Sequence, residues 1–140
     1  MARRADDTIP DDEALFRGLR PEWVDEVGEI LLEAVDYKGT SVNRAAHSSR
    51  ASVLSSRYTR VAEITQSEFP PPTELNGVTW EFIAVDAPLD VTEQFAANDA
   101  HAEIRFHRPS DESREATWPK SSAARDELRA ALAARLRLLS

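Results

Sequence analysis

A stretch near the middle of the second half of the chain, from Asn98 to Pro109, carries two of the three histidines. Apolar and polar side chains alternate along it, which is typical of a β-strand with one buried face. The apolar positions are Ala102, Ile104 and Phe106, and the polar ones are His101, Glu103, Arg105 and His107. Imidazole, carboxylate and guanidinium groups on one face can carry acid–base chemistry or hold an anion. We expect any reactive or ligand-binding surface to lie here.

Metal chemistry at this strand is limited by spacing and by composition. His101 and Glu103 match the His-x-Glu fragment of zinc nucleobase deaminases, but those enzymes also need a cysteine pair, and the chain has no cysteine. His101 and His107 lie roughly 20 Å apart along an extended strand, too far to share an ion. His101 and Glu103 could converge on one ion, with His47 as a further candidate ligand. The simpler interpretation is a solvated face with Glu103 and Arg105 in cross-strand ion pairs. We predict no metal and no cofactor.

Acid–base or phosphoester chemistry remains as an enzymatic alternative. It would use a histidine of this strand as the base and an arginine to hold the anion. It requires residues 41–44 to lie beside the histidine strand; turn capping and a surface ion pair are the simpler roles for Asn43 and Arg44. Phosphate-binding loops and nucleophile elbows are missing, since the four glycines are isolated. The candidate catalytic residues of this alternative are His101, Glu103, Arg105 and Arg44.

The composition excludes several other classes of protein. The net charge of −8 and the pI near 4.9 make nucleic acid and anionic membranes unfavourable ligands. No apolar run approaches the length of a membrane span, and the N-terminus, with Arg3 and Arg4, lacks the apolar region of a signal peptide. The absence of cysteine favours a cytoplasmic location.

The elements around the histidine strand predict an α+β domain. Residues 1–10 have little to bury and should form a disordered arm. Asp11 and Asp12 can cap a helix through Leu19, and Pro21 can begin a second helix through Val35 with apolar residues at three- and four-residue steps. Because Gly28 weakens this helix, the alternative is a short helix to Val27 followed by extended residues 29–35.

The remaining segments predict a small, mainly antiparallel sheet and one further helix. Residues 41–44 should form a short edge strand, residues 58–69 and 78–86 two longer strands, and Asn76-Gly77 a turn. The expected organisation is an α+β domain over 11–108, a linker over 109–120 and an amphipathic C-terminal helix over 121–140, capped by Ser121 or Ser122.

The C-terminal helix carries the strongest signal for an interaction. A short helix is only marginally stable alone, so its leucine seam must be buried somewhere. The seam either packs on the protein's own sheet or docks into a larger partner or a second copy of the chain. The expected partner-binding residues are Leu128, Leu132, Leu136, Leu139 and Arg129.

Four short motifs resemble a pattern in a loose group of small uncharacterised bacterial proteins. The group's pattern is L-x-R … S-V-N-R … D-P-L … A-H-A-x-I, and the matching segments here are Leu15-Phe16-Arg17 with Pro21, Ser41-Val42-Asn43-Arg44, Asp86-Ala87-Pro88-Leu89 and Ala100-His101-Ala102-Glu103-Ile104. Ala87 interrupts the acidic-proline step, and the C-terminal helix lies outside the pattern. The resemblance implies an accessory protein encoded beside larger effectors in defence or conflict operons, and it assigns no catalytic residue.

Together these observations favour a non-enzymatic accessory or adaptor protein that binds a larger protein. The motivation is the lack of a complete catalytic constellation and the leucine seam of the last helix. The alternative is a small enzyme or ligand-binding domain that acts on a nucleotide or phosphorylated ligand through the polar face of residues 100–107.

Overall fold

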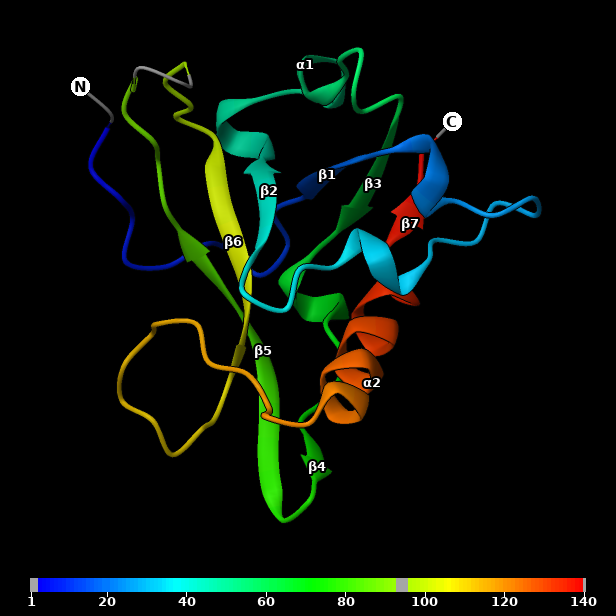
Figure 1. The fold of residues 1–140 in the computed structure, drawn as a ribbon. Coiled ribbons are helices and arrows are strands. Elements are labelled where there is room, and N and C mark those ends of the chain that lie inside the picture. The colour runs from blue at the N-terminus through cyan, green and yellow to red at the C-terminus, as the bar shows by residue number, and fades with distance from the viewer. Residues whose placement is uncertain (1–2, 93–95, 140) are drawn as a thin grey trace.

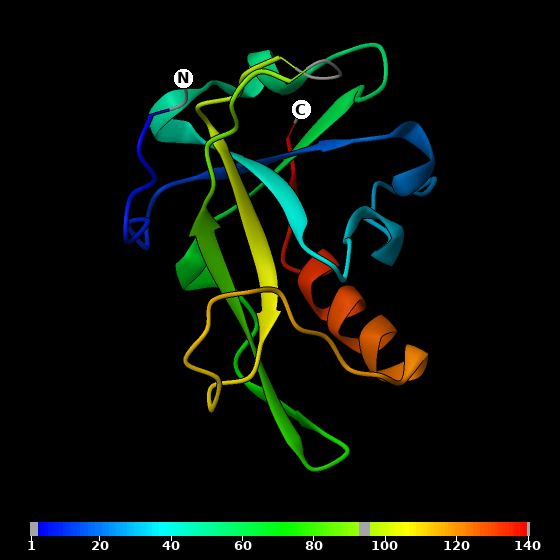
Figure 2. The same cartoon turned by 60° about the vertical axis from the view of Figure 1, so that its left-hand side comes forward.

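Seven strands form one antiparallel sheet in the order β4-β5-β6-β2-β1-β3-β7 (Figure 1) in the computed structural model, which describes residues 3–92 and 96–139. The strands are β1 (Leu15–Leu19), β2 (Thr40–Arg44), β3 (Arg60–Ile64), β4 (Thr73–Leu75), β5 (Val78–Asp86), β6 (His101–His107) and β7 (Arg137–Leu138). The helices of the described part are α1 (Arg50–Val53) and α2 (Ser122–Ala133), with 3-10 turns at Pro21–Trp23, Leu32–Ala34, Ala45–His47 and Gln66–Glu68. The sheet is strongly twisted, and α2 lies against one of its faces (Figure 2).

The prediction of an α+β domain with N-terminal helices is wrong, because the fold is mainly β. Residues 15–19 form β1, which pairs with β2 on one side and β3 on the other. Its Leu15, Phe16 and Leu19 are all buried, so this central strand has apolar residues on both faces. Positions one, two and five of a five-residue segment also fit a helical stripe, which explains the error.

The second predicted helix is a loop that turns back on itself. Val24 and Ile30 form an antiparallel bridge, and the carboxylate of Asp25 accepts hydrogen bonds from the backbone N–H groups of Val27 and Glu29. Gly28 closes this turn with a positive φ of 85°, a conformation that costs glycine little and other residues more. The alternative with a short helix to Val27 is also wrong, since only Pro21–Trp23 makes a single 3-10 turn there.

The strands predicted from alternation are largely confirmed. β5 covers Val78–Asp86 as expected, and Asn76 and Gly77, both at positive φ, form the two-residue turn that joins β4 to β5. Residues 41–44 do lie in a strand, but β2 is an internal strand between β1 and β6 instead of an edge. The histidine strand β6 is central, with β5 and β2 as its neighbours.

One face of the sheet and helix α2 enclose the main core. The side chain of Leu132 is fully buried, and the backbone carbonyl of Val35 accepts a hydrogen bond of 2.8 Å from Arg129 Nε, which fixes the helix to the 3-10 turn before β2. The other buried apolar side chains of this core include Leu15, Leu19, Val42, Ile64, Phe82, Ile104, Phe106 and Leu128. The strands and the helix thus share a single hydrophobic core.

The position of the last helix corrects the predicted partner-binding surface. Ser121 caps α2 as expected, but the helix ends at Ala133 and the chain turns into β7, which pairs with β3. Leu128, Leu132 and Leu136 are buried in the protein's own core, and Leu139 donates its N–H to Val61 O. The seam therefore packs on its own sheet and does not present these leucines to a partner. Within the described residues, no helix has the length and apolar character needed to span a bilayer.

Candidate functional site

The polar face of β6 exists, but Arg44 is not on it. Cross-strand register places His101 opposite Asn43 and Glu103 opposite Ser41, on the face of the sheet that points away from α2. Alternation along β2 turns the neighbouring Arg44 to the other face, where it is 3% exposed. The structure therefore separates Arg44 from the histidine face, and the predicted four-residue catalytic set does not form.

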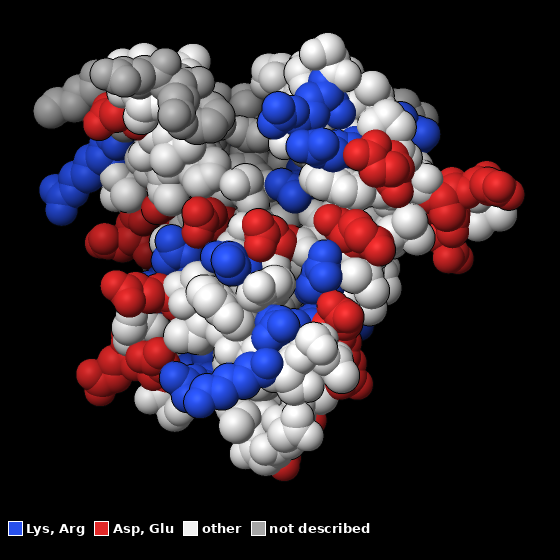
Figure 3. Space-filling view, in the orientation of Figure 1, with Lys and Arg blue, Asp and Glu red and all other residues white. Residues whose placement is uncertain are grey.

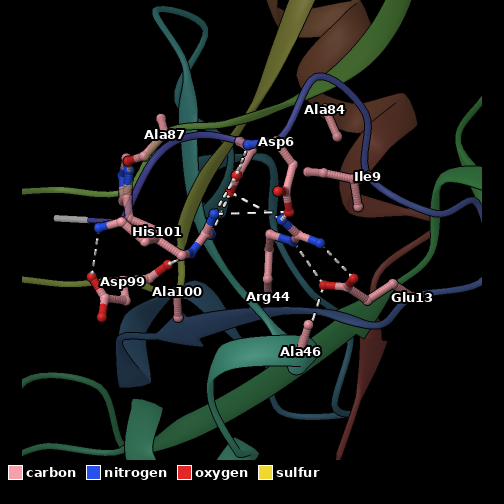
Figure 4. Close-up of polar contacts among 12 residues, drawn as sticks. Asp6, Ile9, Glu13, Arg44, Ala46, Ala84, Ala87, Asp99, Ala100 and His101 are labelled. Carbon is pink, nitrogen blue, oxygen red and sulfur yellow. Dashed lines mark hydrogen bonds and ion pairs between the residues drawn. The ribbon is translucent and has the colours of Figure 1, made fainter.

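Arg44 instead binds three carboxylates in a mostly buried ionic cluster (Figure 4). Its Nε and Nη2 atoms each donate to Glu13 at 2.8 Å, and its Nη1 atom donates to Asp6 at 2.6 Å. Asp86, whose side chain is fully buried, lies 3.2 Å from the same Nη1. All three nitrogen atoms of the guanidinium contact carboxylates of the protein itself, so Arg44 holds the fold together.

The same cluster ties the N-terminal segment to the sheet. Arg3 donates two hydrogen bonds to the carboxylate of Asp86, at 2.6 and 2.7 Å, and the backbone N–H of Asp6 donates a third at 2.7 Å. Ile9 is buried in the core. The sequence predicts a disordered arm over residues 1–10; residues 1 and 2 lie outside the described part, and residues 3–10 lie against the sheet because Asp86 and Arg44 bind them.

The charges of this cluster shift its pKa values in the stabilising direction. Burial alone would raise the pKa of Asp86, but the hydrogen bonds from Arg3, Asp6 N–H and Arg44 outweigh it and lower that pKa from 3.8 to about 2. The hydrogen bonds from Arg44 lower the pKa of Glu13, and those carboxylates in turn raise the pKa of Arg44. The folded state therefore favours ionised carboxylates at both positions.

Acid should consequently destabilise the fold through Asp86. A carboxyl whose pKa is lowered on folding stabilises the protein above its unfolded pKa and loses that contribution as the pH falls through its folded pKa. We expect the free energy of unfolding to fall by roughly 2 kcal/mol between about pH 5 and pH 2 from this group alone. Urea denaturation at a series of pH values measures this.

The Asp86→Asn variant is the control for this pH dependence. It removes the titrating group but keeps the size of the side chain, so its unfolding free energy should vary less with pH over the same range. An unchanged acid dependence in this variant would contradict the assignment of the effect to Asp86.

The lower half of the β6 face is occupied by internal contacts. Arg105 Nε donates to Glu103 at 3.0 Å, along the same strand, and its Nη1 donates to the carbonyl of Arg114 at 2.6 Å. His107 lies between two acceptors, Glu81 Oε1 at 2.9 Å and the carbonyl of Ser113 at 2.8 Å. The predicted cross-strand ion pairs of Glu103 and Arg105 are wrong, because these two residues pair with each other along β6. His107 does lie across from Glu81 of β5, but it is buried, as is His101.

His101, at the upper end of the same face, has a different environment. Its Nδ1 lies 2.7 Å from the carbonyl of Ala87, which can only accept, so Nδ1 carries the proton. Its Nε2 lies 3.2 Å from the hydroxyl of Ser41, which we assign as the donor. His101 is buried whereas Ser41 is exposed. Sequence reasoning missed Ser41, although its place on the same face as His101 follows once β2 is paired with β6.

A cleft of about 440 Å³ opens beside Ser41, where β1 and β2 separate. The two strands pair only at Leu15–Arg44 and Phe16–Asn43. Beyond that point Arg17 bridges the gap: its Nη1 donates to the carbonyl of Ser41 at 2.9 Å and its Nε to the carbonyl of Ala34 at 3.0 Å. The cleft is lined by the aromatic residues Trp23, Tyr37 and Tyr58 and by charged residues of both signs, which are Arg17, Arg129, Glu33 and Asp36.

A second hollow, of about 610 Å³, lies where β4 and β5 extend beyond α2; we call it the Trp118 groove. Trp118 and Val78 are 38% and 37% exposed and both line this hollow. Lys120 and Arg108 contribute positive charge to it. Figure 3 shows basic side chains crossing the lower part of this face of an otherwise acidic protein. The other lining residues are Leu75, Asn76, Trp80, Ala116, Thr117, Pro119 and Ser121.

Comparison with known proteins does not assign this chain to a class. No protein-family model matches the sequence, and neither the curated proteins nor the solved structures include a match. Among the described residues, no three histidine, aspartate or glutamate side chains converge as metal ligands.

Proposed function

We propose that this protein is a small accessory protein that binds an acidic segment of a larger protein, with an aromatic or aliphatic anchor, in the Trp118 groove. The observation that carries the proposal is that two partly exposed apolar residues, Trp118 and Val78, line the same groove as Arg108 and Lys120. Tryptophan and arginine are the residues that most often dominate protein-binding energy. The resemblance to accessory proteins encoded beside larger effectors fits such a role.

Trp118 is held in position before any partner arrives. Its ring packs against that of Tyr37 in a T-shaped arrangement, with centroids 5.6 Å apart, and the guanidinium carbon of Arg125 lies 4.8 Å from the centroid of the Tyr37 ring. Arg125 also donates to the carbonyls of Pro119 and Lys120, at 3.1 and 2.8 Å. A binding side chain that is already ordered loses little conformational entropy on association. This order favours recognition by Trp118 over a role as a mobile surface residue.

The charge around the groove selects the partner's chemistry. Lys120 and Arg108 are cationic on a chain with a net charge of −8. Ser121, the N-cap of α2, also lines the groove, so the positive end of the helix dipole lies beside it. Local positive charge favours carboxylates in the partner and discriminates against basic segments.

Selection from a displayed library of random 12-residue peptides tests this proposal. We expect the immobilised wild-type protein to enrich peptides in which an aromatic or aliphatic residue is flanked by Asp or Glu. Binding of an enriched synthetic peptide should weaken at least tenfold with Trp118→Ala, because tryptophan anchors typically contribute more than about 1.4 kcal/mol. Lys120→Glu should weaken it as well, and more strongly at low salt.

Two exposed sites outside the groove supply matched controls. Val27→Ala removes an exposed apolar side chain, and Arg57→Glu reverses an exposed charge; both should leave peptide affinity unchanged. Enrichment of basic peptides, or peptides that bind Trp118→Ala as well as the wild type, would overturn the proposal. Self-association of the chain that is lost in Trp118→Ala would identify a second copy as the occupant and would also overturn it.

A further inference from the structure

We infer that Ser41 is a nucleophile activated by His101, and that the cleft between β1 and β2 takes small esters with an aromatic or apolar acyl group. This inference concerns the opposite end of β2 from the ionic cluster and a hollow separate from the Trp118 groove. The proposed catalytic pair is Ser41 and His101. Of the residues predicted from the sequence (His101, Glu103, Arg105 and Arg44), only His101 belongs to it.

The geometry supplies a nucleophile, a base and a group that orients the base. The Ser41 hydroxyl lies 3.2 Å from His101 Nε2, within hydrogen-bonding range. The carbonyl of Ala87 holds Nδ1–H at 2.7 Å, which leaves the Nε2 lone pair directed at the hydroxyl proton. His101 is a buried residue and Ser41 an exposed one, so the pair lies at the boundary between the protein interior and its surface. This is the arrangement that a serine nucleophile requires.

The backbone around Ser41 supplies a donor for a developing oxyanion. In an antiparallel strand, successive N–H groups point to opposite sides. Arg44 N donates to Ala100 O, toward β6, so the N–H of Ser41 points the other way, toward β1. The pairing between β1 and β2 ends at Phe16–Asn43, and the N–H of Ser41 therefore faces the gap where the strands separate. Nucleophilic serines use their own N–H in this way.

Next to Ser41 the cleft places a cation, Arg17, and an aromatic wall, although Glu33 and Asp36 also line it. Burial lowers the pKa of Arg17, yet its guanidinium stays charged and lies 2.9 Å from the Ser41 carbonyl. Trp23 stacks under Arg17, with 5.1 Å between the guanidinium carbon and the ring centroid, and its ring lies 6.2 Å from that of Tyr58. An aromatic wall beside a cation suits an apolar acyl group whose carbonyl oxygen becomes negative during attack.

The reaction balances without any further reagent except water. Ser41 Oγ attacks the ester carbonyl carbon while its proton passes to His101 Nε2; the tetrahedral oxyanion then collapses, the C–O bond to the alcohol breaks, and His101 returns the proton to the leaving alcohol. Water, deprotonated by His101, attacks the acyl-serine, and release of the carboxylic acid restores the Ser41 hydroxyl.

Covalent labelling with a fluorophosphonate probe, read by intact-protein and peptide mass spectrometry, tests the inference. The folded wild-type chain should acquire one adduct, on Ser41, and should hydrolyse 4-nitrophenyl acetate. Ser41→Ala should abolish both signals. His101→Gln should slow both by at least about 100-fold, because a general base contributes about that much or more.

Surface residues of the same types serve as controls. Ser56→Ala and His47→Ala alter exposed side chains outside the cleft and should label at the wild-type rate. Circular dichroism of each variant separates loss of chemistry from loss of fold; if Ser41→Ala does not fold, Ser41→Thr, which keeps a hydroxyl, should fold and label more slowly. Failure of the folded wild type to label, or labelling that does not depend on His101, would overturn the inference.

Discussion

An Arg44→Ala variant should lose about 3–5 kcal/mol of unfolding free energy relative to the wild type. The guanidinium neutralises Glu13 and Asp6 and lies beside Asp86, and its side chain is 4% exposed. Removing it leaves the buried carboxylate of Asp86 with Arg3 and the backbone N–H of Asp6, and that of Glu13 without its bidentate partner. A loss of this size is a large part of the total stability of an ordinary domain, which is about 5–15 kcal/mol.

Urea denaturation followed by tryptophan fluorescence measures this loss. Arg137→Ala is the matched control, because Arg137 also pairs with carboxylates, Glu63 at 3.1 Å and Glu68, but its side chain is 44% exposed. An exposed pair is worth at most about 1 kcal/mol. If the two variants lose the same stability, the Arg44 cluster does not hold the N-terminal segment as described.

The second large effect should come from Leu132→Ala, with an expected loss of about 2–5 kcal/mol. Leu132 is completely buried between α2 and the sheet, so its truncation leaves a cavity that the neighbouring side chains can only partly fill. The same experiment decides how the C-terminal leucine seam is used, since a partner-binding leucine would be exposed in the free protein and cheap to remove.

Leu54→Ala provides the comparison, because Leu54 is 48% exposed and lies at the end of α1. Its loss should change the urea midpoint little. A Leu132→Ala protein with the wild-type midpoint would contradict the packing of α2 on the sheet and return the seam to the surface.

The sequence predictions were accurate for elements with one buried face and failed for the strand that is buried on both faces. In β5, β6 and α2 the apolar residues repeat with the period of a strand or of a helix, and Asn76-Gly77 is typical of a turn. The sequence therefore predicted the type of each of these elements correctly. In β1, Leu15 and Phe16 are buried on opposite faces, and the spacing cannot separate a buried strand from a helix. Between Val24 and Ile30 the apolar residues are spaced as in a helix, but no helix forms there. Asp25 and Gly28 make a turn instead.

The candidate sites were less predictable because they depend on pairing between distant segments. Alternation alone already puts Ser41 and Arg44 on opposite faces of their strand, but only the register of β2 with β6 brings Ser41 to His101. Trp118 lies in a polar segment with no periodicity, and its order comes from Tyr37, far away in the sequence. Linear patterns carry no information about such contacts.

The strand order also bears on how the chain reaches its native state. β4 and β5 are joined by a two-residue turn, but Val42 pairs with Ala102, and Ala62 pairs with Leu138, so internal strands find partners far along the chain. Folds dominated by such distant pairings pay loop-closure entropy early and fold in milliseconds to seconds, slower than helical proteins. The hydrophobic core also cannot be completed before Leu128 and Leu132, near the end of the chain, have been synthesised. A ribosome-bound nascent chain should therefore stay protease-sensitive until α2 and β7 have emerged.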